Sequence, residues 1–424
     1  MEKLAYLGGK KTINKELKPY ISFGKEEIES VQSVLQSGEL SRFYGSWHED
    51  FFGGKKVKEF ESNWSKEFEI EYSVSVNSAT SGLIAALGAV GVEPFDEVLV
   101  SPWTMCASAT AILVWNAIPV FVDINPDNFN IDPTKIRSLI TKKTKAIVVP
   151  DIFGQSAQLT EILKIAREFG LKVIEDASQA PGAMYKGKKV GTNADIGVFS
   201  LNYHKHIHTG EGGVCVTADA KLAERLQLIR NHAEAVVGPK GETDISNMIG
   251  FNFRLGEIES AIGIEQLKKL PTIAEQRIRA GALLNEGLKD LKGLKLPLAL
   301  DGCTHVYYMY GLIVDFDLLG VTREKLIEVL TAEGIPSLRP SYLNIHLLPM
   351  YQKRIAYGKS GFPWISPGET SKVTYEKGIC PVAENLQDKS YIGFYFGGFA
   401  LDDEEISLLI AAFRKVWNQL DLIK

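Results

Sequence analysis

The strongest constraint on the fold is a regular alternation of buried strands and helices between residues 72 and 230. The strand-like runs are short and rich in Val and Ile, and the segments between them have the apolar spacing of helices. Strands of continuous apolar residues are buried on both faces, which is typical of a mostly parallel sheet covered by helices. We predict strands at 73–76, 97–100, 120–122, 146–149, 172–174, 196–199 and 214–217. We predict helices at 81–90, 107–115, 160–169 and 222–230.

The rest of the chain is predicted to add an arm and a second domain. Residues 1–24 form an N-terminal arm, residues 25–300 the large domain, and residues 301–424 a smaller α+β domain. Pro271 is expected to separate a helix at 254–270 from a second helix at 273–291. We also predict helices at 26–36, 323–332 and 404–420, a strand at 306–314, and loops rich in glycine and aromatic residues at 37–56 and 351–369. The expected fold is therefore α/β, with a mostly parallel seven-stranded sheet flanked by helices in the large domain.

Composition argues against several classes of function. Of the 424 residues, 45% are hydrophobic, as in an ordinary soluble globular protein. The net charge of −5 and the pI of about 5.9 argue against nucleic-acid or membrane partners. No apolar run is long enough to span a bilayer. The four cysteines are widely spaced and lack paired metal-ligand spacing, so we expect a cytoplasmic protein.

A lysine between two apolar runs is the first candidate for chemistry. Lys205 lies between strand-like runs at 196–201 and 214–216, and a Gly-Glu-Gly-Gly turn follows at 210–213. Lysine condenses with aldehydes, because its neutral amine is a good nucleophile once desolvation lowers its pKa. On this window alone, a solvated hairpin lysine is the simpler interpretation.

Two upstream segments supply what a pyridoxal phosphate site needs besides a lysine. An apolar strand ends at Asp176, and a carboxylate can keep a pyridine nitrogen protonated. Residues 74–83 form a strand, a run of small hydroxylated residues and then a helix, whose N-terminus can hold a phosphate. Asn77, Asp176 and Ser200 all follow strands, and parallel sheets bind ligands at the carboxyl ends of their strands. The three segments together favour a pyridoxal phosphate enzyme.

These motifs resemble those of the DegT/StrS-type sugar aminotransferases, which are pyridoxal phosphate enzymes with the aspartate aminotransferase fold (fold type I). The resemblance runs from about Pro19 to the C-terminus, with motifs at 75–82, 119–123, 174–180, 200–213 and 250–254. In the family motif, the lysine stands six residues before the glutamate of the glycine turn, as Lys205 stands before Glu211. The resemblance implies a pyridoxal 5'-phosphate cofactor and a homodimer with shared active sites.

The resemblance implies catalytic roles for two residues. Lys205 would form the Schiff base with the cofactor and then move a proton as general base and acid, and Asp176 would pair with the pyridinium nitrogen. Glu175 is the alternative partner, but neighbours along a strand face opposite sides, and the family motif selects Asp176. Gln179 matches the position that contacts the phenolic oxygen of the cofactor.

The resemblance also implies how the phosphate is held. The backbone N–H groups of Ala79 and Thr80 and the hydroxyl of Ser200 are expected to bind it, with Ala79 standing where the family usually has glycine. Asn252, in a Gly-x-Asn-x-Arg run, resembles the residue that reaches the phosphate from the other subunit. Each active site would then need a dimer.

Two departures leave alternatives open. The family commonly has an aromatic residue after the threonine that matches Thr104, stacked on the pyridine ring, but here Met105 follows. Met105 or Trp103 would then cover the ring. The histidines at 204, 206 and 208 would share one face of a strand, as in a three-histidine zinc site, but Lys205 and the glycine turn already account for the segment, so we expect no metal.

The predicted reaction transfers an amino group from glutamate or glutamine to a keto sugar, either nucleotide-linked or a keto-cyclitol, in amino-sugar or secondary-metabolite biosynthesis. One alternative is a dehydratase or lyase on the same cofactor. Some relatives carry histidine in place of the lysine and are dehydratases, so Lys205 favours transamination. A second alternative is a cofactor-binding regulator without turnover, for which an intact site is more than the role requires. The sugar would be held by variable loops such as 37–56 and 351–369, so the sequence does not identify it.

Overall fold

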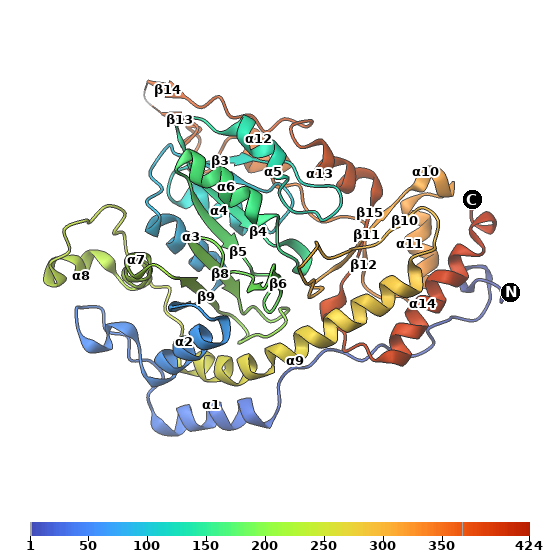
Figure 1. The fold of residues 1–424 in the computed structure, drawn as a ribbon, viewed down its shortest axis with the longest axis horizontal. Helices are drawn as coiled ribbons and strands as arrows, with labels where there is room; N and C mark the ends of the chain where they lie inside the picture. The colour runs from blue at the N-terminus through green and yellow to red at the C-terminus, as the bar shows by residue number, and fades with distance from the viewer. Residues whose placement is uncertain (1, 367) are drawn as a thin grey trace.

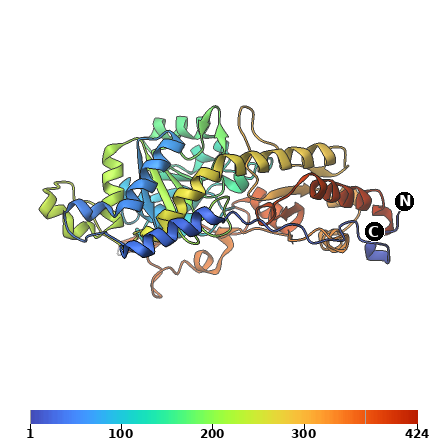
Figure 2. The ribbon, with the colours of Figure 1, turned by 90° about the horizontal axis from the view of Figure 1, so that it is seen from below.

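The computed structural model of the chain describes residues 2–366 and 368–424. The molecule is elongated, with a large sheet-centred part at one end and a smaller part at the other (Figure 1). Helix α9 (Glu257–Leu288) runs from beneath the sheet along the smaller part, and both chain ends lie at the far end of the smaller part (Figures 1 and 2). Within the described residues, no helix combines the length and the apolar character needed to cross a membrane.

A seven-stranded sheet forms the centre of the large part, in the order β1-β9-β8-β5-β4-β2-β3. Strand β9 is antiparallel to both of its neighbours, and every other pairing in this sheet is parallel. The strands are β1 (Tyr72–Val76), β2 (Glu97–Val100), β3 (Ile118–Phe121), β4 (Thr144–Pro150), β5 (Lys172–Asp176), β8 (Ile196–Ser200) and β9 (Gly213–Thr217). Each overlaps a predicted strand, so the α/β fold with a mostly parallel sheet is confirmed.

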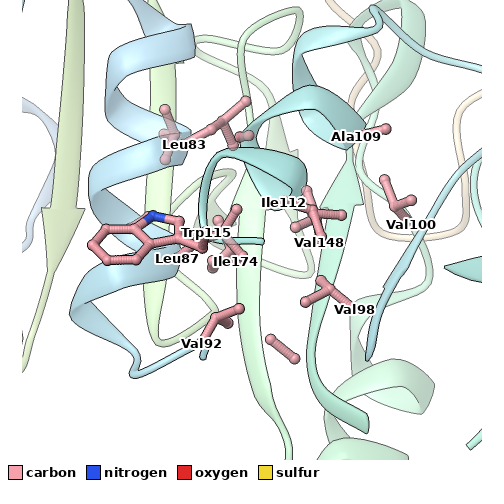
Figure 3. Packing of buried hydrophobic residues seen from close by; sticks show 14 of the residues in the cluster. Leu83, Leu87, Val92, Val98, Val100, Ala109, Ile112, Trp115, Val148 and Ile174 are labelled. Atoms are coloured by element: carbon pink, nitrogen blue, oxygen red, sulfur yellow. The ribbon is translucent and has the colours of Figure 1, made fainter. Parts of the chain in front are cut away.

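Helices cover both faces of this sheet because its strands are apolar on both faces. In Figure 3, Leu83 and Leu87 of α3 (Ala79–Ala89) pack against one face beside Ile112 of α4 (Ala107–Val114) and the ring of Trp115. The ring of Trp115 lies so close to α3 that a Cβ on Gly88 would stand 2.2 Å from it. The opposite face is covered by α2 (Lys55–Phe68), α6 (Leu159–Phe169) and the first half of α9. The large part therefore has three layers, with the strands of the sheet in the middle.

The smaller part is built on a second sheet, in the order β10-β11-β15-β12, whose neighbouring strands are all antiparallel. These strands are β10 (Leu294–Lys295), β11 (Tyr310–Val314), β12 (Leu338–Arg339) and β15 (Tyr391–Phe394), and α11 (Arg323–Ala332) and α14 (Asp403–Trp417) pack on them. Three apolar side chains of residues 2–24, namely Leu4, Ile13 and Leu17, are buried in the same cluster. The predicted strand at 306–314 is too long, because the N–H groups of Val306 and Met309 bond to the loop at 153–154, and that of Tyr307 bonds to the His305 side chain, instead of to a strand.

The prediction that Pro271 ends a helix is wrong. Helix α9 is 32 residues long in total, and Pro271 lies inside it. A proline inside a helix costs ~3 kcal/mol, because it lacks the N–H that would bond one turn back. The large apolar side chains around it, Leu267, Leu270 and Ile273, are each buried in the core below the sheet, and each contributes about 1.5–3 kcal/mol. Packing on both sides of the proline therefore outweighs its local cost.

The remaining elements are short or peripheral. The helices are α1 (Lys25–Ser37), α5 (Pro133–Ile136), α7 (Ala220–Arg230), α8 (Ala233–Lys240), α10 (Phe316–Leu319), α12 (Pro349–Lys353) and α13 (Pro381–Asn385). Two hairpins are formed by β6 (Met184–Tyr185) with β7 (Lys188–Lys189), and by β13 (Ile365–Ser366) with β14 (Glu369–Thr370). The predicted loop at 351–369 thus contains the end of α12 and one strand of a hairpin.

Candidate active site

A cavity of about 210 Å³ lies at the carboxyl ends of β4, β5 and β8, beside the N-terminus of α3. This is the edge at which parallel sheets bind ligands. Seven of the eight residues that the sequence predicts for the site line this cavity: Ala79, Thr80, Met105, Asp176, Gln179, Ser200 and Lys205. The eighth, Asn252, does not. Segments that are up to 126 residues apart in the chain, from 79 to 205, are thus brought to one place by the strand order.

Lys205 is buried in the turn that connects β8 to β9. Its backbone N–H donates to the Asn202 carbonyl at 2.9 Å, and its side chain is only 7% exposed. The Nζ atom lies 4.5 Å from the centre of the Tyr308 ring. Burial lowers the pKa of this amine to about 8, although the negative charge of Asp176 partly opposes the shift. Such an amine is often neutral near physiological pH and is placed to act as a nucleophile.

Asp176 ends β5 and faces the cavity with two hydrogen-bond donors behind it. Ser108 Oγ donates to Oδ2 at 2.8 Å, and the Ser178 N–H donates to Oδ1 at 3.3 Å. Donors of this kind stabilise the ionised carboxylate. Glu175 points the other way along the strand, lies outside the cavity wall and is fully buried, with Oε2 accepting from the Asn193 N–H. Of the two acids, only Asp176 faces the cavity.

The N-terminus of α3 offers free backbone donors to the cavity. Ser78 is the N-cap, and its Oγ accepts from the Ser81 N–H at 3.1 Å, which leaves the N–H groups of Ala79 and Thr80 to bind a ligand. Ser200 lines the same wall. Gly213 lets β9 approach this turn closely, since a Cβ there would stand 2.8 Å from the Ala79 nitrogen. Backbone donors at a helix N-terminus form a good anion site.

Met105, and not Trp103, is placed to cover a ring in the cavity. Met105 lines the wall and is 57% exposed, whereas Trp103 is fully buried in the core and packs against Tyr391. The structure therefore favours Met105 over Trp103, and the covering of the ring stays a prediction. Tyr342 also lines the cavity, and its hydroxyl accepts from Gln179 Nε2 at 3.1 Å.

The three alternating histidines do not share a strand face. They lie in the turn after β8 and have separate partners: His204 bonds to the Tyr308 hydroxyl, His206 to the Val306 carbonyl, and His208 packs on Phe23. Over the part of the chain that the structure describes, no group of three or more His, Cys, Asp or Glu residues is arranged to hold a metal ion. Only His204 lines the cavity.

Asn252 lies on the surface, outside the cavity of its own chain. Its Oδ1 accepts from Arg254 Nε at 2.8 Å, and its carbonyl accepts from Asn77 Nδ2 at 3.3 Å. The segment is held next to the strand end by the Asn77 N–H, which donates to the Phe253 carbonyl at 2.8 Å. The predicted contact between Asn252 and a phosphate on another subunit stays a prediction.

Sequence reasoning missed four residues of the site: Ser108, Asp151, Tyr308 and Tyr342. Asp151 had a usable signal, because it directly follows β4 as Asp176 ends β5. Ser108 is the second residue of α4, and only the packing of α4 beside β5 brings it to Asp176. The two tyrosines come from beyond α9, at positions that no local pattern connects with the large sheet.

Comparison with known proteins agrees with this geometry. The family described as the DegT/DnrJ/EryC1/StrS aminotransferase family matches residues 22–387. GDP-perosamine synthase of Caulobacter vibrioides is 37% identical over 300 residues, which cover 70% of this chain and 79% of that protein. L-Glutamine:2-deoxy-scyllo-inosose aminotransferase of Streptomyces kanamyceticus is 32% identical over 406 residues, or 92% and 91%. The structure of DesI in the presence of its TDP-sugar product has a TM-score of 0.79 at 26% identity and covers 99% of this chain and 97% of that one.

Proposed function

We propose that this chain, which belongs to the DegT/DnrJ/EryC1/StrS aminotransferase family, transfers the amino group of glutamate or glutamine to a keto sugar. The family and the named relatives show that the chain is a pyridoxal-phosphate-dependent sugar aminotransferase. The sugar and the donor are the proposed part. The observation that carries the proposal is the burial of Lys205 in the cavity that Asp176 and the N-terminus of α3 share.

The cavity fits pyridoxal phosphate at three points. The Lys205 amine is buried beside an aromatic ring, with no carboxylate in salt-bridge contact among the described residues. Asp176 carries two donors that favour its anion, as a partner of a protonated ring nitrogen requires. Ala79 and Thr80 present unused N–H groups at a helix N-terminus, as a phosphate requires. We therefore assign the aldehyde, the ring nitrogen and the phosphate of the cofactor to these three places.

Each residue has a defined task in the reaction that we propose. When bound, pyridoxal phosphate supplies an aldehyde carbon and an electron-withdrawing ring. The Lys205 amine would hold the aldehyde carbon, and it would act as the base that takes a proton from the carbon of the amino donor and as the acid that gives a proton to the carbon of the acceptor. Asp176 holds the proton on the ring nitrogen, and Ser108 fixes the Asp176 carboxylate in place. Met105 covers one ring face and excludes water from it.

The names of two relatives indicate the class of acceptor. One is a GDP-perosamine synthase, whose name contains a nucleotide-linked sugar, and the name of the Streptomyces kanamyceticus aminotransferase contains glutamine and a cyclitol ketone. These two names support a keto sugar or keto-cyclitol acceptor here. All four cysteines are free thiols, which supports the proposal of a reducing cytoplasm.

We further propose a homodimer in which Asn252 completes the phosphate site of the neighbouring subunit. Asn252 is exposed, and its segment is held beside the strand-end edge through Asn77 and the Phe253 carbonyl. An exposed amide next to one cavity, but outside it, is available to a second copy of the chain.

The proposal is tested with a panel of acceptors. Purified enzyme loaded with pyridoxal phosphate is mixed with glutamate or glutamine and with nucleotide-linked 4-keto sugars, nucleotide-linked 3-keto sugars or a keto-cyclitol. Amino-sugar product is followed by mass spectrometry. We expect product with one acceptor class, and none with Lys205→Ala protein. Turnover of ordinary 2-keto acids alone, with every keto sugar inert, would contradict the proposal.

A further inference from the structure

Asp151 is a buried acid in the cavity wall to which the reaction above gives no task. It directly follows β4, where Pro150 pairs in register with Asp176 of β5. The Asp151 N–H donates to the Asp176 carbonyl at 3.0 Å. The backbone of Asp176 is therefore tied to Asp151, and whatever fixes Asp151 also fixes the residue that faces the cavity.

Asp151 and Glu175 each lack a donor for one carboxyl oxygen. Asp151 Oδ1 accepts from the Ala157 N–H at 2.9 Å, and Glu175 Oε2 accepts from the Asn193 N–H at 3.2 Å. The other oxygens, Asp151 Oδ2 and Glu175 Oε1, are buried without a donor among the described residues. The two carboxyl groups come from paired neighbouring strands, since Glu175 pairs in register with Val149, two residues before Asp151, and they act on each other electrostatically. Two carboxyl oxygens can bond only if one of them carries a proton.

Burial raises the pKa of both acids, and neighbouring carboxylates raise the pKa of Asp151 further. The charged groups that act on Asp151 are the carboxylates of Glu175 and Asp176. Burial raises the pKa of Glu175 to about 7, and burial together with the Glu175 carboxylate raises the pKa of Asp151. Two buried carboxylates in contact cannot both ionise without strong repulsion. The Asp176 carboxylate has other partners, the donors of Ser108 and Ser178.

We propose that Asp151 and Glu175 share a proton, and that this carboxyl–carboxylate pair clamps the ends of β4 and β5 so that Asp176 keeps its orientation toward the cavity. Asp151 is thus a positioning residue that acts through Asp176. No covalent bond changes, since the proton stays between two oxygens. The proton sharing is a property of the protein without its cofactor, whereas the benefit to catalysis rests on the proposed function.

Infrared spectroscopy of the cofactor-free protein tests the shared proton. At about pH 7, ordinary surface carboxyl groups are ionised, so the C=O band of a protonated carboxylic acid reports buried acids. We expect this band to weaken in both Asp151→Asn and Glu175→Gln proteins and to persist in Asp132→Asn, a control at the N-cap of α5. A spectrum without the band, or one that neither of the two substitutions changes, overturns the proposal, whatever the enzyme's substrate.

The clamp is tested by comparing two substitutions at one position. In Asp151→Asn the amide can still donate to Glu175, whereas in Asp151→Ala the Glu175 oxygen stays unpaired. Leaving a buried charged acceptor unpaired costs enough to lower kcat/KM by about tenfold or more. The ¹⁵N chemical shift of bound, ring-labelled pyridoxal phosphate reports the proton at Asp176. We expect the shift to move in Asp151→Ala and to be restored in Asp151→Asn. If the Asn variant is as damaged as the Ala variant, Asp151 acts as an anion and the clamp is wrong.

Discussion

Lys205 in the cofactor-free protein should react with an aldehyde far faster than an ordinary lysine at neutral pH. Its pKa is lowered from 10.5 to about 8 by burial. At pH 7.5 an amine with a pKa of 8 is about one-quarter neutral, whereas one with a pKa of 10.5 is about one part in a thousand neutral. The neutral amine is the nucleophile, so the structure implies an advantage of roughly two hundredfold.

The assay follows capture of pyridoxal phosphate by the cofactor-free protein. The rate of appearance of visible absorbance is measured between about pH 6 and pH 10, and borohydride then fixes the product for peptide mapping. We expect label on Lys205 and a rate that levels off above a midpoint near 8. Lys268 is 63% exposed at its side chain, so Lys268→Ala protein is a matched control that should leave the profile unchanged.

Asp176 also affects the pKa of Lys205, and this gives a second expected shift in the pH profile. Asp176 raises the pKa of Lys205 by stabilising the ammonium form. Asp176→Asn removes that charge, so the midpoint should move to lower pH. A rate that keeps rising beyond pH 10, or a midpoint that moves upward in Asp176→Asn, would refute the account of Lys205 as a desolvated amine. Label on another lysine would refute the assignment of the residue.

Four further predictions concern the acids, their donors and the subunit contact. The Asp176→Asn protein should still bind the cofactor through the phosphate site, but its activation barrier should rise by roughly several kcal/mol and its turnover should fall accordingly. Near wild-type turnover would point to a different acid. Ser108→Ala removes a hydrogen bond to a charged group worth ~1.5–3 kcal/mol, so kcat/KM should fall at least about tenfold, with Ser108→Thr less affected. Because burial raises the folded pKa of Glu175 from 4.5 to about 7, the free energy of unfolding should fall as pH rises through that range. Chemical denaturation should show a flatter profile for Glu175→Gln. Inactive Lys205→Ala and Asn252→Asp proteins should regain activity after subunit exchange, since one site of a mixed dimer carries neither defect; inactive mixed dimers would contradict the shared site.

The sheet could be predicted from the sequence because its signal is local. Most strands of the large sheet contain a run of buried apolar residues, and the polar residues that end β5 and β8, Asp176 and Ser200, mark the edge where the cavity forms. The alternation of side chains along β5 also predicts that Asp176 and Glu175 face opposite sides of the sheet, and in the structure only Asp176 lines the cavity. A pattern of this kind needs no knowledge of the rest of the chain.

The features that the sequence did not predict depend on contacts between distant segments. Nothing beside Trp103 in the chain shows that its ring is buried against Tyr391, so its exposure could not be predicted from the local motif. Pro271 carries a strong local signal for a break, and the packing of α9 against the sheet overrides it. Tyr342 enters the cavity through a hydrogen bond to Gln179, 163 residues away.

The difference between local signals and long-range contacts also explains why the sequence identifies Asp176 but not the residues around it. Its position at the end of β5 follows from a five-residue strand, but its donor Ser108 comes from α4 and its neighbour Asp151 from β4. A carboxylate at a strand end can partner a ring nitrogen only if its side chain does not turn away. Ser108 Oγ donates to the Asp176 carboxylate, and the Asp151 N–H donates to the Asp176 carbonyl, so both contacts hold Asp176 in place. Catalytic competence at this position is therefore a property of three sheet and helix ends together. Substitution of Ser108, whose side chain bonds to Asp176, or of Asp151, whose side chain we propose pairs with Glu175, should affect the reaction through Asp176.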